Sequence, residues 1–149
     1  MKTLVINKKA QYQYEFLEKF KAGIVLKGQE VKSIKAGRMA LGGSFVVLKE
    51  GEVFLIGANI PAWQPKNAPP DYEPQRNRKL LLKKLEIKKL IGLSAQKGLT
   101  IVPLRVYTER GNIKVEFGIA RGKKKFDKRE KIKKREIERE IKRALKEKK

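Results

Sequence analysis

Side chains that could bind nucleic acid gather in three clusters, and the first is "NKKAQYQY" (residues 7–14). Lys8 and Lys9 precede Tyr12 and Tyr14 by three to six residues. This spacing allows ammonium groups to hold phosphates while a ring stacks on an unpaired base. The alternative is the end of a strand whose tyrosines pack in the core. We favour the alternative for Tyr14 and weigh the two interpretations equally for Tyr12.

The second cluster is "RNRK" (residues 76–79), which lies between a proline-rich segment and a leucine-rich one. Arg76 and Arg78, one residue apart in a predicted loop, could bind backbone phosphates in register, with Lys79 beside them. The alternative is a solvated helix face above a leucine stripe. We expect phosphate contact.

The third cluster is the terminal segment, residues 122–149, which holds 15 Lys and Arg residues and 6 acidic ones. Ile137, Ile141 and Leu145 recur at helical spacing, and Glu130 lies four residues before Lys134. Because this apolar stripe is narrow and helices depend mainly on tertiary burial, the pattern predicts a segment that is disordered alone and helical on RNA.

The residue types that most catalytic sites need are missing. The chain has no histidine and no cysteine, which excludes Ser-His and Cys-His nucleophiles and the usual zinc sites. Glu30, Asp71 and Glu73 are the acids with unusual neighbourhoods, and we interpret them as ion-pair or loop residues. No glycine motif has Walker spacing. The sequence therefore predicts a protein that is not an enzyme and has no cofactor and no metal.

Charge indicates the class of partner. A net charge of +22 on 149 residues, with a pI near 10.3, favours a polyanion, and nucleic acid is the foremost candidate. The first residues lack the apolar run of a signal peptide, and no stretch reaches the roughly 20 apolar residues of a membrane span. We expect a cytoplasmic protein.

Hydrophobic patterns predict the elements that position these clusters. Two hairpins are expected, with turns at residues 49–51 and 110–112, and residues 12–20 alternate as a strand does. Pro103 inside a predicted strand indicates an edge or a bulge. Residues 78–98 and 28–37 are expected to be helices, and residues 60–77, with five of the six prolines, an irregular connection.

Five or six short antiparallel strands with inserted helices are typical of a small closed barrel, of which the OB-fold is the nucleic-acid-binding version. We therefore predict a mainly β protein with two or three short helices. The predicted division is a barrel over residues 1–121 and a basic tail over residues 122–149. The 40% of apolar residues suffices for one core if the tail is left out.

Several motifs in order resemble those of the SsrA-binding protein (SmpB) family over essentially the whole chain. They are "NKKA", "AGIVLKGQEVKSIKAG", "GEVFLIGANI", "RNRKLLLKKLEIKKL", "GLTIVPL" and "ARGKKKFDKRE". The resemblance implies a barrel that binds the tRNA-like domain of transfer-messenger RNA (SsrA RNA) and accompanies it into stalled ribosomes in trans-translation. It also implies elongation factor Tu and alanyl-tRNA synthetase as partners through the charged RNA.

The resemblance assigns RNA binding to Asn7, Glu30 and Leu90, with Glu30 accepting a hydrogen bond from a base or orienting Lys32. Together with the clusters above, the expected RNA-binding residues are Asn7, Lys8, Lys9, Tyr12, Glu30, Lys32, Arg76, Arg78, Lys79 and Leu90. For the tail, the resemblance implies a helix in the empty messenger channel of the ribosome. The expected tail residues are Gly122, Lys123, Lys124, Asp127, Lys128, Arg129, Lys133, Lys134 and Arg135.

One position departs from the family pattern: Tyr12 stands where many relatives have histidine. Stacking would survive this exchange, whereas a hydrogen bond donated by the ring would not. Two alternatives from other classes remain open, a ribosomal protein that holds rRNA structurally and an RNA-modifying enzyme. The missing catalytic residue types disfavour the enzyme.

Overall fold

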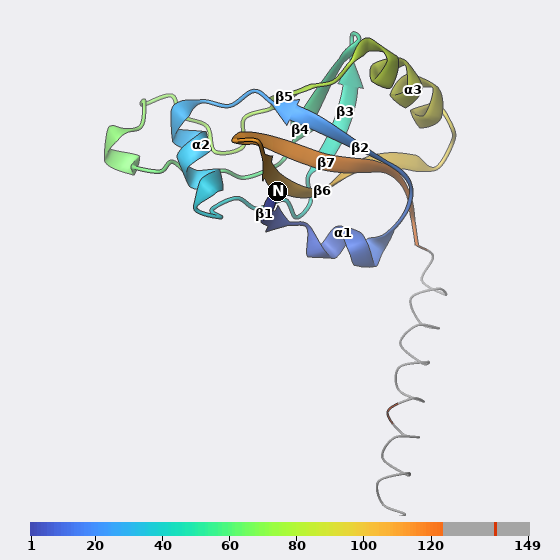
Figure 1. The fold of residues 1–149 in the computed structure, drawn as a ribbon, viewed down its shortest axis with the longest axis horizontal. Helices are drawn as coiled ribbons and strands as arrows, with labels where there is room; N and C mark the ends of the chain where they lie inside the picture. Colours follow the sequence, from blue (N-terminus) through green and yellow to red (C-terminus); the bar gives the residue numbers. More distant parts are fainter. Residues whose placement is uncertain (124–138, 140–149) are drawn as a thin grey trace, which may run out of the picture.

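A computed structural model describes residues 1–123 and residue 139, and in these residues three α-helices flank a curved antiparallel sheet (Figure 1). The elements in chain order are β1 (Lys2–Ile6), α1 (Lys8–Gln13), β2 (Tyr14–Ile24), α2 (Gly28–Lys35), β3 (Phe45–Lys49), β4 (Glu52–Ile56), the 3₁₀ helix η1 (Pro65–Asn67), β5 (Arg78–Leu81), α3 (Lys84–Ser94), β6 (Leu99–Glu109) and β7 (Asn112–Gly122). The predictions for the tail beyond Lys123 therefore lie outside the described residues.

The described strands pair in the order β1-β6-β7-β2-β5-β4-β3, and every pair is antiparallel. Strand β2 pairs with β7 along most of its length and with β5 at Gly23 and Ile24. The prediction of a mainly β, antiparallel protein is confirmed. Among the described strands the pairing ends at β1 and β3, so the predicted closure of the barrel is not confirmed.

Both predicted hairpins form, and each turns on two residues with positive φ. Glu50 and Gly51 have φ of 52° and 76°, and Arg110 and Gly111 have φ of 52° and 79°. Two positive φ angles are typical of the type I′ turn, whose twist matches that of the flanking strands. Pro103 lies at a register shift between β6 and β7, which confirms the predicted bulge.

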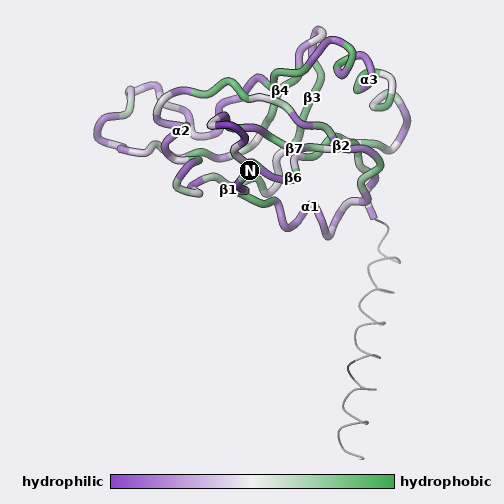
Figure 2. Tube along the Cα trace, in the orientation of Figure 1, coloured by the Kyte–Doolittle hydropathy of each residue, from purple (hydrophilic) through white to green (hydrophobic). Residues whose placement is uncertain are grey.

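One face of the sheet forms the core. The rings of Phe20 in β2 and Phe117 in β7 stack 5.7 Å apart, and Ile34 of α2 and Leu90 of α3 are fully buried against this side. The irregular connection at residues 60–77 projects beyond α2, as predicted, and Figure 2 colours most of it from hydrophilic to neutral. Apart from Ile60, which is fully buried in the core, the proline-rich segment adds little to the core.

The start of the predicted strand at Tyr12 was wrong, because α1 occupies Lys8–Gln13 and β2 begins at Tyr14. The alternation of tyrosines satisfied a two-residue period by chance, whereas the helix is initiated by Asn7, whose Oδ1 accepts a hydrogen bond from the amide of Ala10 (3.3 Å). Tyr12 therefore lies on a helix.

The predicted helix at residues 78–98 was partly wrong. Its first residues form β5, since Arg78 pairs with Leu55 and Leu80 pairs with Val53, and α3 begins only at Lys84. Pairing with two neighbouring strands overrides the helical preference of the leucines. Leu85, one of the leucines in this segment, is 79% exposed and so lies outside the leucine stripe that the segment was expected to bury.

Candidate nucleic-acid interface

Asn7 links α1 to the sheet through hydrogen bonds. It is 4% exposed, and its Nδ2 donates a hydrogen bond to the carbonyl of Pro103 (2.9 Å), while its Oδ1 caps α1. Its backbone amide donates to the carbonyl of Leu104 (2.8 Å). Because the side chain of Asn7 is almost fully buried, it has little surface for contact with RNA. Its role in RNA binding can only be to position α1.

Helix α1 brings the first cluster together. Lys8 and Lys9 precede Tyr12 by four and three residues, so the three side chains are neighbours on the helix surface. Tyr12 is 60% exposed. The backbone amide of Lys123 donates to the carbonyl of Gln13 (2.8 Å), which brings the end of β7 to the same place. We call Lys8, Lys9, Tyr12, Gly122 and Lys123 the α1 surface.

Glu30 is the centre of a buried ion cluster. Its Oε1 accepts hydrogen bonds from Nη2 of Arg76 (2.6 Å) and the amide of Lys27 (2.8 Å), and its Oε2 accepts from Nε of Arg78 (2.7 Å). Burial raises the pKa of Glu30, but the bonds from Arg76, the Lys27 amide and Arg78 outweigh burial and lower it below its usual value. The carboxylate therefore remains ionised.

Because of these ion pairs, much of the second basic cluster (residues 76–79) is buried. Arg78 is fully buried and also donates to the carbonyls of Ala58 (2.8 Å) and Pro74 (2.9 Å). The side chain of Arg76 is 27% exposed, and Lys79 is exposed beside Glu52. In this conformation Arg78 and Glu30 have no surface with which to contact RNA, and their predicted roles can act only through the residues that they position.

Leu90 and Lys32, two other expected RNA-binding residues, differ in exposure. Leu90 is fully buried in the core, which agrees with packing rather than contact. Lys32 lies exposed on α2 and lines a shallow hollow with Lys27, Asp71 and Tyr72. Of these two residues, only Lys32 can reach a ligand directly.

A second exposed surface, which the sequence analysis missed, lies on the face of the sheet opposite the core. Residues paired across antiparallel strands project from the same face. Leu81 of β5 pairs with Gly23 of β2, Gly23 pairs with Lys114 of β7, and Lys114 pairs with Tyr107 of β6. The alternate residue Ala22 is buried in the core. This row therefore faces outward across four strands.

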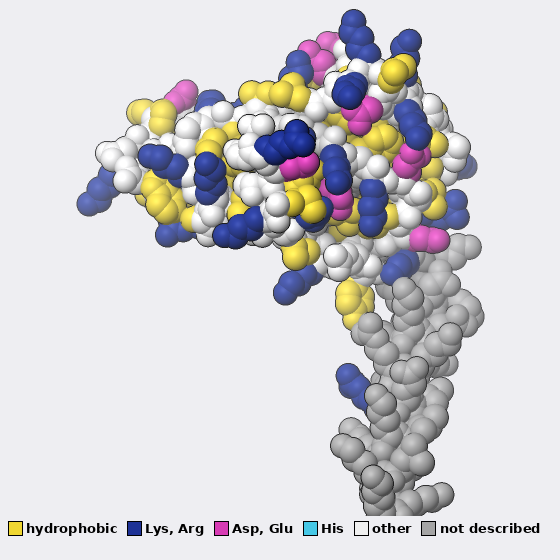
Figure 3. Space-filling view, viewed as in Figure 1, with side chains coloured by type: hydrophobic (Ala, Val, Ile, Leu, Met, Phe, Trp, Pro, Cys, Tyr) yellow, Lys and Arg dark blue, Asp and Glu magenta, His cyan; other side chains and the backbone are white. Residues whose placement is uncertain are grey.

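The next row adds cations. Lys21 and Arg105 both pair with Glu116, and Nε of Arg105 lies 3.3 Å from its carboxylate. Lys19 lies two residues from Lys21 on the same strand and face. Figure 3 shows dark-blue side chains spread over this side of the molecule with magenta ones between them. The outer-sheet surface consists of Lys19, Lys21, Leu81, Arg105 and Lys114, with Gly23 between them and Tyr107 beneath.

Tyr107 holds two of these cations in place. Its ring is fully buried, and it lies 4.4 Å from the guanidinium carbon of Arg105 and 5.9 Å from Nζ of Lys21. Cations over an aromatic ring are attracted by its negative face. Burial, followed by the charge of Glu109, raises the pKa of Tyr107, so the phenol is neutral at physiological pH.

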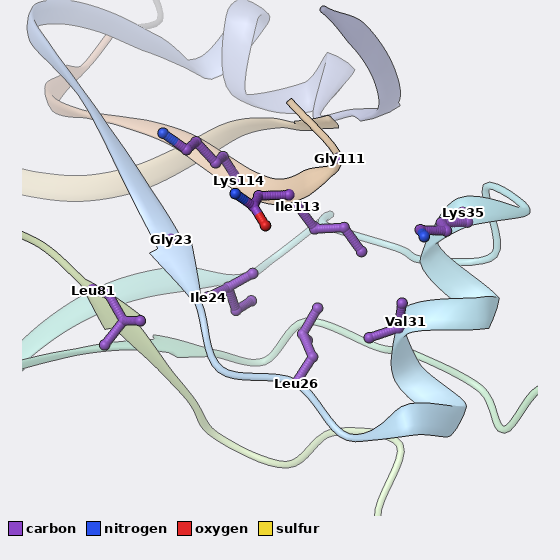
Figure 4. Close-up of a pocket in the computed structure, with 10 residues that line it drawn as sticks. Gly23, Ile24, Leu26, Val31, Lys35, Leu81, Gly111, Ile113 and Lys114 are labelled. Atoms are coloured by element: carbon purple, nitrogen blue, oxygen red, sulfur yellow. The ribbon is translucent and has the colours of Figure 1, made fainter. Parts of the chain in front are cut away.

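Gly23 leaves a gap in the outward row. An added Cβ there would lie 3.5 Å from Cβ of Leu81, so any side chain would fill this space. The gap opens into a groove of about 440 Å³ (Figure 4). The groove is lined by Gly23, Ile24, Leu26, Val31, Lys35, Leu81, Gly111, Asn112, Ile113 and Lys114. An apolar floor with lysines at its rim suits a nucleoside and its phosphates.

Two other kinds of site are absent from residues 1–123 and residue 139. No group of three acidic side chains there is placed to hold a metal ion. No helix in the same part of the chain is long and apolar enough to cross a membrane. Among the described residues, the α1 surface and the outer-sheet surface are candidates for contact with RNA.

Comparisons with known proteins find relatives that match most of the chain. A family model described as SmpB protein matches residues 4–147. Relatives named SsrA-binding protein include one from Gloeobacter violaceus, 50% identical over 97% of this chain and 94% of its own length. Another, from Geobacillus kaustophilus, is 48% identical over 98% of this chain and 94% of its own length.

A solved structure gives a matching fold. A chain described as "tmRNA-SmpB: a journey to the center of the bacterial ribosome" has a TM-score of 0.67 and 47% sequence identity, and the match covers 80% of this chain and 84% of that chain. The sequence and fold comparisons therefore point to the same family.

Proposed function

This chain belongs to the SmpB family, and we propose on that basis that it binds the tRNA-like domain of transfer-messenger RNA and delivers this RNA to stalled ribosomes in trans-translation. The relatives named SsrA-binding protein and the solved tmRNA-SmpB chain support this function. A net charge of +22 fits a partner of this kind.

The observation that carries the proposal for this chain is the outer-sheet surface. Three strands, β2, β6 and β7, present Lys19, Lys21, Arg105 and Lys114, with one carboxylate, Glu116, paired to Arg105. Lys114 also lines the apolar groove beside Leu81. Lysines that contact phosphates fix the position of an RNA, while the gap beside Leu81 admits part of a nucleotide. Rigid strands hold all of these groups, which favours recognition of a shaped RNA. The curved sheet would then act as an open version of an oligonucleotide-binding barrel.

The tail supplies a second contact, with the ribosome, while Lys8, Lys9 and Tyr12 of the α1 surface are proposed to contact transfer-messenger RNA. The end of β7 lies against α1 through the bond between Lys123 and Gln13, so the tail starts beside Lys8, Lys9 and Tyr12. In this proposal residues 122–149 enter the empty messenger channel, where their excess of basic residues meets rRNA phosphates. Support for this part comes from the sequence and from the solved relative described with the ribosome.

In this proposal the chain is an RNA-binding factor rather than an enzyme. Because it acts on ribosomes, it works in the cytoplasm. Elongation factor Tu and alanyl-tRNA synthetase would meet it through the charged RNA. No chemical step is assigned to its own residues, because the absence of histidine and cysteine removes most catalytic constellations.

Binding of the full-length chain to a transcript of the tRNA-like domain, measured over a salt series, tests this function. We expect affinity to fall steeply with salt, and Lys21→Ala with Lys114→Ala to lower the slope of log affinity against log salt by roughly 1.4 to 1.8. Lys49→Ala, an exposed lysine at the end of β3, is the matched control. Equal binding of an RNA of the same length and unrelated shape would contradict the proposal.

A structural ribosomal protein is distinguished by its stoichiometry. It would remain on every ribosome through a high-salt wash, whereas a rescue factor is substoichiometric and enriched on ribosomes that hold truncated messages. Retention on all washed ribosomes would exclude the rescue function.

A further inference from the structure

The segment between β4 and β5 contains an arm at residues 61–77, which projects beyond α2 (Figure 1). Ser33 Oγ donates a hydrogen bond to the carbonyl of Pro61 (2.5 Å), and the backbone amide of Gln64 donates to Oε1 of Gln29 (2.9 Å). These two bonds from α2 lie on either side of Trp63, the only tryptophan in the chain. The backbone around Trp63 is thus fixed to a helix.

Arg38 is fixed against Trp63 by the end of the same helix. Gly37 has a φ of 76°, its amide donates to the carbonyl of Ile34 (2.9 Å), and the amide of Arg38 donates to the carbonyl of Ser33 (2.8 Å). This pair of bonds is the Schellman motif that closes helices. It directs the guanidinium of Arg38 over the indole, 4.8 Å from the ring centroid.

The indole also lines an open hollow of about 490 Å³. Gln64, Pro65, Lys66 and Asn67 complete the lining, and no acidic residue belongs to it. Asn67 Nδ2 donates to Oε1 of Gln64 (2.8 Å), which holds the two amides together, and Lys66 is exposed at the edge. Trp63 therefore combines an aromatic ring that already carries a guanidinium with a hollow lined by a lysine and two amide groups.

We propose that Trp63 and Arg38 form a stacking site for one unpaired RNA nucleotide, whose neighbouring phosphates are held by Lys66 and Arg38. Aromatic rings and guanidinium planes stack on bases exposed in loops, bulges and ends of RNA. A guanidinium already stacked on an indole binds with less loss of conformational freedom. An aliphatic side chain of a protein partner would need an apolar pocket, whereas this hollow carries a lysine and two amides.

The inference rests on the proposed function and adds a contact separate from the outer-sheet and α1 surfaces. The unpaired nucleotide belongs either to the tRNA-like domain or to ribosomal RNA, because both have exposed bases. Two binding measurements on the full-length chain separate these sources: affinity for the tRNA-like transcript, and association with ribosomes stalled on a truncated message.

Trp63→Leu removes the stacking surface, and Trp63→Phe keeps a smaller one. We expect Trp63→Leu to weaken one of the two associations by roughly 5- to 100-fold and Trp63→Phe to restore most of the loss. A role limited to holding the arm would change the thermal unfolding temperature of Trp63→Leu without these losses. Unchanged association with both partners would overturn the inference.

A direct measurement excludes indirect effects. A photoreactive benzoylphenylalanine at position 63 should cross-link to a defined nucleotide, mapped by reverse-transcription stops, in transfer-messenger RNA or in ribosomal RNA. Cross-links to a protein only, or to no molecule, would overturn the inference. If the wild-type chain binds the tRNA-like transcript while position 63 gives no RNA cross-link, the proposed function stands and the stacking site fails. If the wild-type chain does not bind the transcript, the proposed function itself fails.

Discussion

Glu30 is buried and binds two arginines, Arg76 and Arg78. Its negative charge contributes more to stability than its ability to form hydrogen bonds. With Glu30→Gln, Arg78 would remain buried without a counter-charge, which costs on the order of 3 kcal/mol of unfolding free energy. Urea unfolding measures this loss. Glu52→Gln, at the exposed ion pair with Lys79, is the control and should cost less than about 1 kcal/mol. Equal small losses in both variants would contradict the cluster's structural role.

The same residue predicts a pH dependence. Because the folded pKa of Glu30 lies below its usual value of 4.5, its contribution to stability is complete above that value. It is lost as the pH falls from about 4.5 through the folded pKa, since the unfolded chain binds the proton first. Glu30→Gln should therefore flatten the acid limb of the curve of unfolding free energy against pH. A curve of unchanged shape would show that Glu30 does not titrate differently in the two states.

Substitutions of Tyr12 test whether the α1 surface stacks on a base. If its ring stacks on a base, Tyr12→Ala should weaken RNA binding by about 1 to 3 kcal/mol, and Tyr12→Phe should weaken it little. Titration of the tRNA-like transcript and of stalled ribosomes with both variants measures the two effects. Negligible losses for both variants would show that Tyr12 is no stacking platform.

At the scale of elements, α1 depends on its cap. Asn7→Ala removes the acceptor for the Ala10 amide and the donor to the Pro103 carbonyl, so we expect a loss of about 1 to 3 kcal/mol in unfolding free energy. Gln11→Ala, on the exposed side of α1, should change stability by less than about 0.5 kcal/mol. Similar values for the two variants in thermal unfolding would contradict the capping role.

The elements also show which features could be predicted from sequence. Gly51 and Gly111 between alternating apolar runs specify local turns, and both hairpins were predicted because their signals lie within a few residues. The strand at Arg78–Leu81 was not predicted, because it forms by pairing with β4 and β2, which lie far away in the sequence. Local propensity cannot report such a pairing.

The site was less predictable than the fold for the same reason. Lys8, Lys9 and Tyr12 were grouped correctly because they share one short segment. Leu81 and Lys114 meet across Gly23 only through strand register, which the sequence analysis did not assign. A glycine inside a strand was the available signal, since it often marks a close approach of another group. Glu30 was interpreted as an ion-pair or loop residue, and it does form ion pairs, whereas Arg78 was expected to contact phosphate. Their mutual pairing, which allows both side chains to be buried, could not be assigned from the sequence.

At the scale of the whole molecule, folded surfaces and tail are expected to divide the work. Deleting residues 123–149 should leave affinity for the tRNA-like domain nearly intact, because the outer-sheet surface remains. The same deletion should abolish alanine transfer to stalled chains in reconstituted translation, because the ribosomal contact is lost. A large loss of affinity for free RNA would assign the tail to the first step instead.

The central claim is that this chain selects transfer-messenger RNA among the cell's RNAs, and the RNA that accompanies it measures this most directly. The tagged full-length chain is purified from its own cells at physiological salt, and the bound small RNAs are sequenced. We expect transfer-messenger RNA to dominate, and its share to fall when Lys21→Ala and Lys114→Ala are combined. A population made mainly of rRNA fragments or tRNA, unchanged in the double variant, would contradict the claim.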